Sequence, residues 1–308
     1  MEFFFKLFIA INLMIAFCGC TRHADDMETK FYFTANTFGG KDFRENTGSC
    51  VYENGKVKKL YRYQVRTRVT KDGSKLIAFT EDRGKDIEIV DLKTNEIMKR
   101  FKHEQYPTEF RWFRDKTKVI MTAGSRHGIG PDITEEIYIL DLDTMETKKI
   151  TDYKEKNSIY AMDLSPDEKK VVYSVKRKKI DKLPIVKVID LEIKEEKILP
   201  FSALSFVWNP LNNKIILFGI YNDHKGDIEY GARLIVYDPE TEKIVKKYPK
   251  DDSYSDMMWM TNSPDGKKIA YIRESKGRRS IWTMDPDGTN QKLVWNPGFF
   301  LRDLNWTK

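Results

Sequence analysis

Two segments of this sequence place a histidine among carboxylates, a combination that binds several divalent metal ions. One segment contains His127 and Asp132, and the other contains His224 between Asp223 and Asp227. Neither segment has the ligand spacing of a metal motif, so the pattern alone predicts no metal site and no other cofactor. The two segments remain candidates for binding.

Sequence motifs of the common hydrolases and oxidoreductases are absent. The segment Gly124–Gly128 carries its serine at the wrong position for a nucleophile elbow. His103 and Glu104 are not followed by a second histidine, because position 107 is a proline, and this excludes a zincin helix. We therefore predict no catalytic residues.

Two short runs of basic residues, 176–179 and 278–279, are further candidates. They could contact a phosphate-rich polymer or lipid head groups, and the alternative is that they are ordinary solvated side chains. Together with the histidine segments they make up the predicted binding face, which comprises His127, Asp132, Lys176, Arg177, Lys178, Lys179, Asp223, His224, Asp227, Arg278 and Arg279.

A regular repeat governs where all these residues lie. An aspartate follows an alternating apolar run five times, at intervals of 50, 49, 48 and 47 residues, at Asp91, Asp141, Asp190, Asp238 and Asp285. Each period contains four runs of the length of a β-strand. Four short strands in a repeat of this length are typical of a β-propeller blade.

Each period also contains a turn that leads directly into a buried strand. The clearest copies are Ser263–Tyr271 and Ser165–Tyr173, and Thr70–Phe79 is a third. The serine, proline, aspartate and glycine of the first copy suit a type I turn. This pattern resembles the WD40-like (PD40) repeats of the TolB-type propeller family, and the resemblance covers roughly residues 30 to 308.

The two ends of the chain are expected to form one further blade. Lys30–Thr34 reads as a second strand, and Arg302–Trp306 supplies the missing first strand, with Trp306 in register with Trp112 and Trp208. Five internal blades and this shared blade predict an all-β, six-bladed propeller with four antiparallel strands in each blade. The resemblance implies the same architecture, because TolB-like propellers close their ring by sharing a blade between the termini.

A propeller of this kind has a central channel lined by the first strand of every blade. We expect these strands to begin on the face that carries the variable loops between second and third strands, where binding residues are often found. The alternative is that polar residues there only hydrate the channel. The predicted channel mouth consists of Glu109, Arg111, Asp163, Asp256, Arg302 and Asp303.

The N-terminal segment differs in composition from the rest of the chain. Leu7–Gly19 is almost wholly apolar, and a helix of 13 residues spans only about 20 Å of a bilayer core of ~30 Å. Residues 1–19 are therefore predicted to be a cleaved signal peptide. The end of this segment resembles the lipobox of bacterial lipoproteins, which implies lipid attachment at Cys20. The alternatives are a plain secretory signal and an uncleaved anchor. Residues 20–29 would then be a tether, and residues 30–308 the propeller.

These features predict an exported, lipid-anchored monomer of the cell envelope whose propeller is a binding or scaffold module. The TolB resemblance implies an envelope protein as the partner. The net charge of +7 leaves an anionic envelope polymer as another possibility, and no nucleic-acid partner is expected. The resemblance extends to propeller lyases that use metal ions, so the alternative function is an enzyme, a lyase or hydrolase, that acts on envelope or extracellular glycans.

Overall fold

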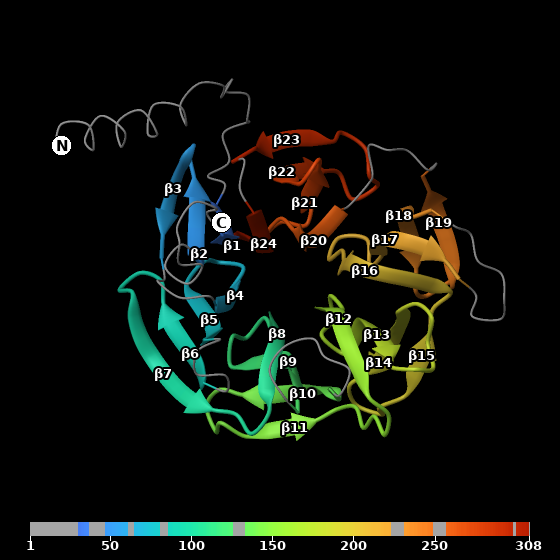
Figure 1. Ribbon diagram of the computed structural model, residues 1–308, viewed down its shortest axis with the longest axis horizontal. Coiled ribbons are helices and arrows are strands. Elements are labelled where there is room, and N and C mark those ends of the chain that lie inside the picture. The colour runs from blue at the N-terminus through green and yellow to red at the C-terminus, as the bar shows by residue number, and fades with distance from the viewer. Residues whose placement is uncertain are drawn as a thin grey trace.

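The computed structural model of this chain describes residues 30–36, 47–60, 65–80, 86–125, 133–222, 231–248, 257–297 and 300–307. The described residues form six antiparallel sheets of four strands each and contain no helix. The sheets stand as blades around a central channel (Figure 1). The predicted all-β, six-bladed propeller is confirmed.

Every blade has the same order of strands from the channel to the rim. The innermost strands are β4 (Val65–Val69), β8 (Tyr106–Trp112), β12 (Asn157–Leu164), β16 (Phe201–Trp208), β20 (Met257–Asn262) and β24 (Phe300–Thr307). The second strands are β5 (Lys75–Thr80), β9 (Lys118–Gly124), β13 (Lys170–Arg177), β17 (Ile215–Tyr221), β21 (Ile269–Ser275) and β1 (Lys30–Asn36). The third strands are β6 (Asp86–Asp91), β10 (Glu135–Asp141), β14 (Ile185–Asp190), β18 (Arg233–Asp238), β22 (Arg278–Met284) and β2 (Thr47–Glu53). The outer strands are β7 (Glu96–Lys102), β11 (Thr147–Lys149), β15 (Glu196–Ile198), β19 (Lys243–Lys247), β23 (Lys292–Trp295) and β3 (Lys56–Lys59).

We number the blades by their inner strands, so that β4 belongs to blade 1, β8 to blade 2, β12 to blade 3, β16 to blade 4, β20 to blade 5 and β24 to blade 6. Blade 6 joins the two ends of the chain, because β24 pairs with β1 and places Trp306 opposite Phe31. The rings of these two residues pack with centroids 4.9 Å apart. The predicted closure by a shared blade is therefore confirmed.

The hydrophobic core consists of six separate layers, one between each pair of neighbouring blades. Successive residues of a strand point to opposite faces of its sheet. Leu76 of β5 accordingly packs towards blade 6, and Ile77 packs towards blade 2. Because both faces are covered, the second and third strands read as nearly continuous apolar runs.

Repeated polar side chains fix the turns between these strands. The hydroxyl of Ser165 donates to Asp167 at 2.6 Å and accepts the backbone N–H of Lys170 at 2.8 Å. Ser263 repeats this arrangement with Asp265 and Lys268, at 2.7 and 2.9 Å. Both strands that follow therefore start in the same way, as the sequence repeat predicts.

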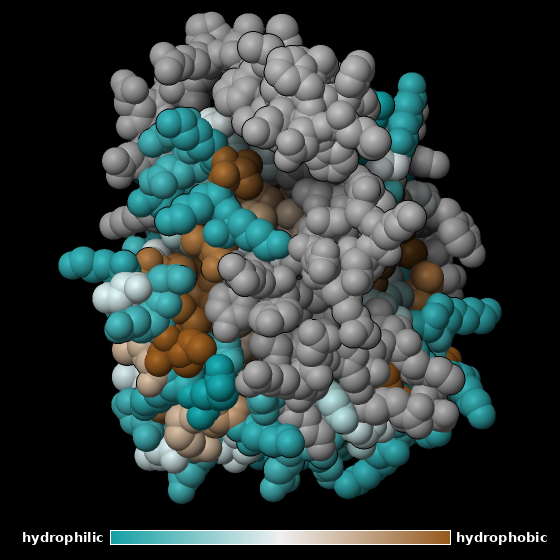
Figure 2. Space-filling model, turned by 60° about the vertical axis from the view of Figure 1, so that its left-hand side comes forward, coloured by the Kyte–Doolittle hydropathy of each residue, from teal (hydrophilic) through white to brown (hydrophobic). Residues whose placement is uncertain are grey.

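The outer strands are largely exposed and rich in lysine, which protects an unpaired sheet edge from association with other strands. They also expose single apolar residues such as Val57, Ile97 and Met98. The side view in Figure 2 shows hydrophilic side chains over much of the described surface, with apolar ones between them. Within the described ranges there is no helix long and apolar enough to span a membrane.

Candidate functional site

The inner strands end on one face of the ring, and we call it the turn face because it carries the turns that follow these strands. The opposite face, which carries the connections between second and third strands, is the loop face. A cavity of about 350 Å³ lies where the channel opens on the turn face. Its walls are the last residues of all six inner strands and the turns that follow several of them.

One repeated position contributes a side chain from every blade to this cavity. In blades 2, 4 and 6 it immediately precedes the repeated tryptophan, which packs in the layers between blades. The six residues, which we call the channel ring, are Arg68, Arg111, Asp163, Val207, Thr261 and Asn305. Their chemistry differs from blade to blade, although the strands that carry them repeat.

Glu109 links the first two members of the ring. Its Oε1 accepts hydrogen bonds from Nη2 of Arg68 and from Nη1 of Arg111, so one carboxylate oxygen joins β4 and β8. The side chain of Glu109 is only 14% exposed. A charge buried to this extent is stable only when it is paired, and here it is paired twice.

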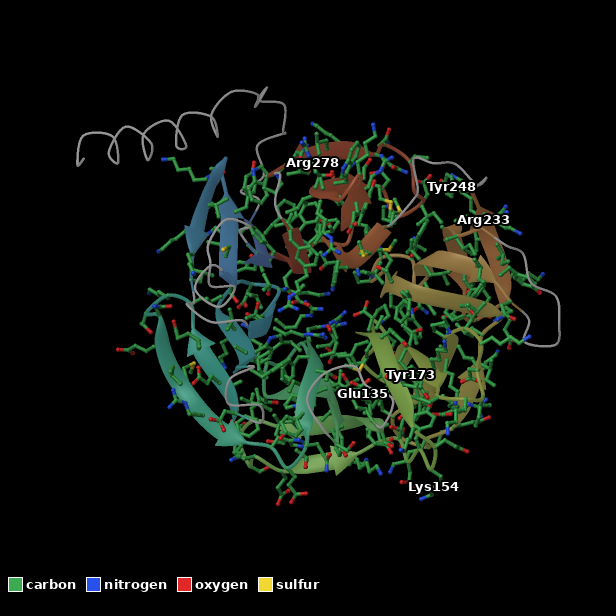
Figure 3. All side chains as sticks on the ribbon, in the orientation of Figure 1. Glu135, Lys154, Tyr173, Arg233, Tyr248 and Arg278 are labelled. Carbon is green, nitrogen blue, oxygen red and sulfur yellow. The ribbon has the colours of Figure 1, made fainter. Side chains whose placement is uncertain are left out.

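The polar network continues into two more blades. Nε of Arg111 lies 3.3 Å from Oδ1 of Asp163 on β12. Oδ2 of Asp163 accepts the backbone N–H of Trp208 on β16 at 2.8 Å. A continuous chain of charged contacts therefore fixes the inner strands of blades 1 to 4 relative to one another, and Figure 3 shows nitrogen-bearing side chains reaching the channel from the side of β4 and β8.

The charges of this network fix its protonation. Burial would raise the pKa of Glu109, but the charges of Arg68 and Arg111 outweigh burial and lower the pKa to about 2. Burial lowers the pKa of Arg68, whereas for Arg111 the charges of Glu109 and Asp163 overcome burial and raise the pKa. Both guanidinium groups remain charged, since arginine does not lose its proton in proteins.

The middle of the channel has an irregular wall. The register of the inner strand shifts in blades 2 to 6, and in blades 3 and 4 the extra residues are Tyr160 and Leu204. Such bulges often redirect a side chain beside a functional site. Tyr160 is 37% exposed and Leu204 is 57% exposed. Because neighbouring blades cover both faces of each sheet, side chains exposed here face the channel.

The rim of the cavity is held by contacts between neighbouring turns. Lys116 forms an ion pair with Asp72, which joins the turns of blades 1 and 2. The backbone N–H of Arg114 donates to Glu168 at 2.6 Å and joins blades 2 and 3. Lys71 also lines the cavity and is exposed. The mouth is thus a rigid scaffold with an exposed cation at its edge.

The residues predicted for the channel mouth fall into three groups. Arg111 and Asp163 line the cavity, but they lie near the ends of their strands on the turn face, because the strands begin at Tyr106 and Asn157. Arg302 and Asp303 lie in the first half of β24, where Asp303 has a φ of 57° in the irregular stretch of the strand. Asp256 is outside the described residues.

The basic run at residues 176–179 lies on the loop face, at the end of β13. Arg177 binds its neighbour Asp181 through Nε at 3.1 Å and through Nη2 at 2.9 Å, so this guanidinium stabilises its own loop. Lys179 is exposed. The other candidates of this face and the lipid-attachment residue lie outside the described residues: His127, Asp132, Asp223, His224, Asp227 and Cys20.

Arg279 was predicted to lie on a surface loop, but the structure places it in the strand β22. Lys276 and Gly277 form a two-residue hairpin turn, both with positive φ, so β22 already begins at Arg278. Arg278 is exposed (Figure 3). Arg279 is buried, donates from Nε to Glu274 at 2.7 Å and from Nη1 to the carbonyl oxygen of Leu301 at 2.8 Å, and has a structural role at the junction of blades 5 and 6.

Sequence reasoning did not single out Arg68, Val207, Thr261 or Asn305 as members of the site. An alignment of the inner strands on the tryptophans and on the turns would have shown one position at which the residue type differs from blade to blade. Among the residues that the structure describes, no group of three or more His, Cys, Asp or Glu could hold a metal ion.

No family model matches the sequence, and no curated protein matches it. Solved structures do match in fold. TolB from Acinetobacter baumannii has a TM-score of 0.65 at 17% identity over 92% of this chain and 67% of that chain. A putative TolB from Agrobacterium tumefaciens gives 0.60 at 12% identity over 88% of this chain and 90% of that one. An oligogalacturonate lyase in complex with manganese gives 0.58 at 15% identity, over 81% and 71%. At these identities the similarity shows the fold, which is that of the TolB-like six-bladed propellers.

Proposed function

We propose that this chain is an exported, lipid-anchored binding module of the bacterial cell envelope. In this proposal the propeller is a rigid scaffold, and a partner protein binds at the turn-face mouth of the channel. The lipid on Cys20 would keep the module at a membrane surface. The propeller itself would act as a monomer.

One observation carries the proposal of a binding site at the mouth. Strands, turns and tryptophans repeat from blade to blade, but the channel ring changes from Arg68 and Arg111 through Asp163 to Val207, around a cavity of about 350 Å³. Folding accounts for part of this variation, because Val207 packs between blades 4 and 5 and the charged members stabilise the ring, but it does not account for the open cavity that these residues surround. A rigid frame that presents different side chains at one concave surface is the usual form of a recognition site.

The fold neighbours support a binding role in the envelope without establishing it. Two of the similar structures are a TolB and a putative TolB. The lipobox-like end of the N-terminal segment at Cys20 supports export and anchoring.

Crosslinking in intact cells tests the proposal. A photoreactive amino acid at Lys71, on the rim of the cavity, is expected to capture an envelope protein, whereas the same amino acid at Val245 on the exposed outer strand β19 is not. Cys20→Ser should release the protein from the membrane fraction. Capture only from Val245, or a native N-terminus without lipid, would contradict the proposal.

The second candidate is a propeller enzyme that acts on envelope or extracellular glycans. The similarity to an oligogalacturonate lyase in complex with manganese favours it. Metal analysis of the purified protein after incubation with manganese separates the two. Stoichiometric manganese together with cleavage of an acidic oligosaccharide would favour the enzyme.

A further inference from the structure

The cationic side of the channel mouth has donors that can bind a ligand. Arg68 and Arg111 share one carboxylate oxygen of Glu109, and Asp163 pairs with Arg111 on its other side, so the charges of these four residues balance. Beyond them the cavity wall carries three lysine or arginine side chains and two acidic ones, which makes the mouth as a whole cationic. In the described part of the chain, the contacts of Arg111 use Nε and Nη1, which makes Nη2 the nitrogen that can donate to a ligand.

These guanidinium groups are already ordered before any ligand binds. Glu109 and Asp163 hold Arg111 from two sides, and Nη1 also donates to the carbonyl oxygen of Phe110 at 2.8 Å. A fixed, planar guanidinium group recognises a carboxylate with defined geometry and loses little entropy when it does so.

The next two blades around the channel, 3 and 4, present apolar surface. Tyr160 and Leu204 are the bulge residues of adjacent inner strands, and those strands contact each other. A leucine side chain that is 57% exposed inside a channel is unfavourably solvated. Since Leu204 precedes Val207 of the channel ring by three residues on β16, this apolar site lies about 10 Å deeper than the arginines.

We infer that the channel takes an extended segment of a partner protein in which an apolar side chain is separated by about three residues from a carboxylate. Three extended residues span about 10 Å, which matches the difference in depth between the two sites. The carboxylate binds Nη2 of Arg111, and the apolar side chain contacts Leu204 and Tyr160. This inference rests on the proposed function, and it adds the chemistry of the bound segment.

A phosphate-bearing polymer is the competing occupant. Arginine also binds phosphate, and the exposed Lys71 would add to that attraction. The polymer has no group that would cover Leu204 and Tyr160, however, and a protein segment with an apolar side chain does. Charge and apolar surface together therefore favour the protein segment.

The experiment is a selection of short random peptides displayed between Gly-Ser spacers, carried out on the purified full chain in detergent. We expect the enriched peptides to share an Asp or Glu about three residues from a Leu, Ile, Phe or Trp. A synthetic peptide of that consensus is then measured by fluorescence anisotropy, with its C-terminus amidated and with it free. Tight binding of the amidated form assigns the carboxylate to a side chain, and binding only of the free form assigns it to a protein C-terminus.

Two variants and two controls make the result specific. Arg111→Gln should weaken binding of the consensus peptide about tenfold or more, because it removes a charge-assisted hydrogen bond. Leu204→Asp should weaken binding to a similar degree. Because Leu204 is exposed and does not contribute to the packed core, this variant tests the inference even if Arg111→Gln folds poorly. Arg278→Gln at the exposed start of β22, away from the cavity, and Leu293→Asp on β23, where the leucine is 46% exposed, should change binding less than about twofold.

The inference is overturned if the enriched peptides lack carboxylates or apolar residues, or if Leu204→Asp binds them as the parent does. It is also overturned if no peptide is enriched, or if inorganic polyphosphate binds at the arginines and the peptides do not. These failures are distinct from failure of the proposed function. A protein captured from Lys71 in cells would still establish the binding module, with a different chemistry of recognition.

Discussion

Nε of Arg111 lies 3.3 Å from Oδ1 of Asp163, across the boundary between blades 2 and 3. Elsewhere the contact between neighbouring blades is mainly an apolar layer, and the hydrophobic effect that stabilises it is non-directional. A charged contact of this kind has a defined geometry, so it fixes the inner strands in register. The same is true of Glu109 between blades 1 and 2. The channel mouth is therefore held in register by charged contacts of defined geometry, which suits a binding site.

The first prediction concerns Glu109. Glu109→Gln should lower the free energy of unfolding at neutral pH by about 3 kcal/mol, because it leaves two buried guanidinium groups without their shared counter-charge. Urea unfolding of parent and variant at pH 7 measures the difference. Glu168→Gln, on the more exposed rim, is the control and should cost less than about 1 kcal/mol. Equal losses for both variants would mean that the buried network does not stabilise the ring.

The same carboxylate should make stability depend on pH. The pKa of Glu109 falls to about 2 in the folded chain from an ordinary value of 4.5. Its contribution is therefore fully present above pH 4.5 and is lost as the pH falls towards 2. We expect the parent to lose stability more steeply than Glu109→Gln in this window, and parallel curves would contradict the assigned pKa.

The closure of the ring gives the second prediction. Trp306 is buried between blades 5 and 6 and packs on Phe31. Trp306→Ala should lower the free energy of unfolding by about 3–5 kcal/mol, and deletion of residues 301–308 should cost more, because β1 would lose its inner neighbour. Thermal unfolding measures both. A deletion variant that melts at the temperature of the parent would contradict closure through β24.

The fold could be predicted from the sequence because each repeat contains residues whose hydrogen bonds fix a local turn. The side chain of Asp91 accepts the N–H groups of Lys93 and Thr94 at 2.8 and 3.0 Å, and Asp141, Asp190 and Asp238 cap their turns in the same way. Each aspartate thus fixes one hairpin turn of one blade. The interval between the aspartates is the length of a blade, and so it could be read without any knowledge of the structure.

The site was less predictable because it depends on contacts between blades. Nothing near Glu109 in the sequence indicates that Arg68 approaches it, since the two residues meet only when blades 1 and 2 pack. The bulges that expose Tyr160 and Leu204 likewise depend on the register against β13 and β17. Arg279 was expected at the surface because its neighbours in the sequence are polar, and its burial is due to Phe300 and Leu301 on the inner strand of the next blade.

The third prediction uses the neighbouring residues Arg278 and Arg279. Arg279 donates to Glu274 and to Leu301, and its guanidinium group lies 3.6 Å from the centroid of the Phe300 ring. Arg279→Ala should lower the free energy of unfolding by about 2 kcal/mol or more, because it leaves a buried carbonyl oxygen without its donor. Arg278→Ala should change it by less than about 0.5 kcal/mol. Chemical denaturation of both variants measures this difference, and similar values for the two would contradict the structural role of Arg279.

The last prediction decides between the two faces of the ring. The loop face carries the exposed Lys179 and the partly exposed Lys178, and the turn face carries the exposed Lys71 and Arg114 beside the cavity. Reversal of either pair to glutamate should leave the melting temperature nearly unchanged, since exposed charges contribute little to stability. If an acidic segment binds at the channel mouth, Lys71→Glu with Arg114→Glu should slow its association, and more so at low salt, because steering by surface charge is screened by ions. Lys178→Glu with Lys179→Glu should slow association much less.

Capture of the partner by the purified variants at two salt concentrations measures both effects. The opposite result, with only the loop-face pair affecting capture, would place the binding surface on the variable loops and leave the cavity as part of the scaffold.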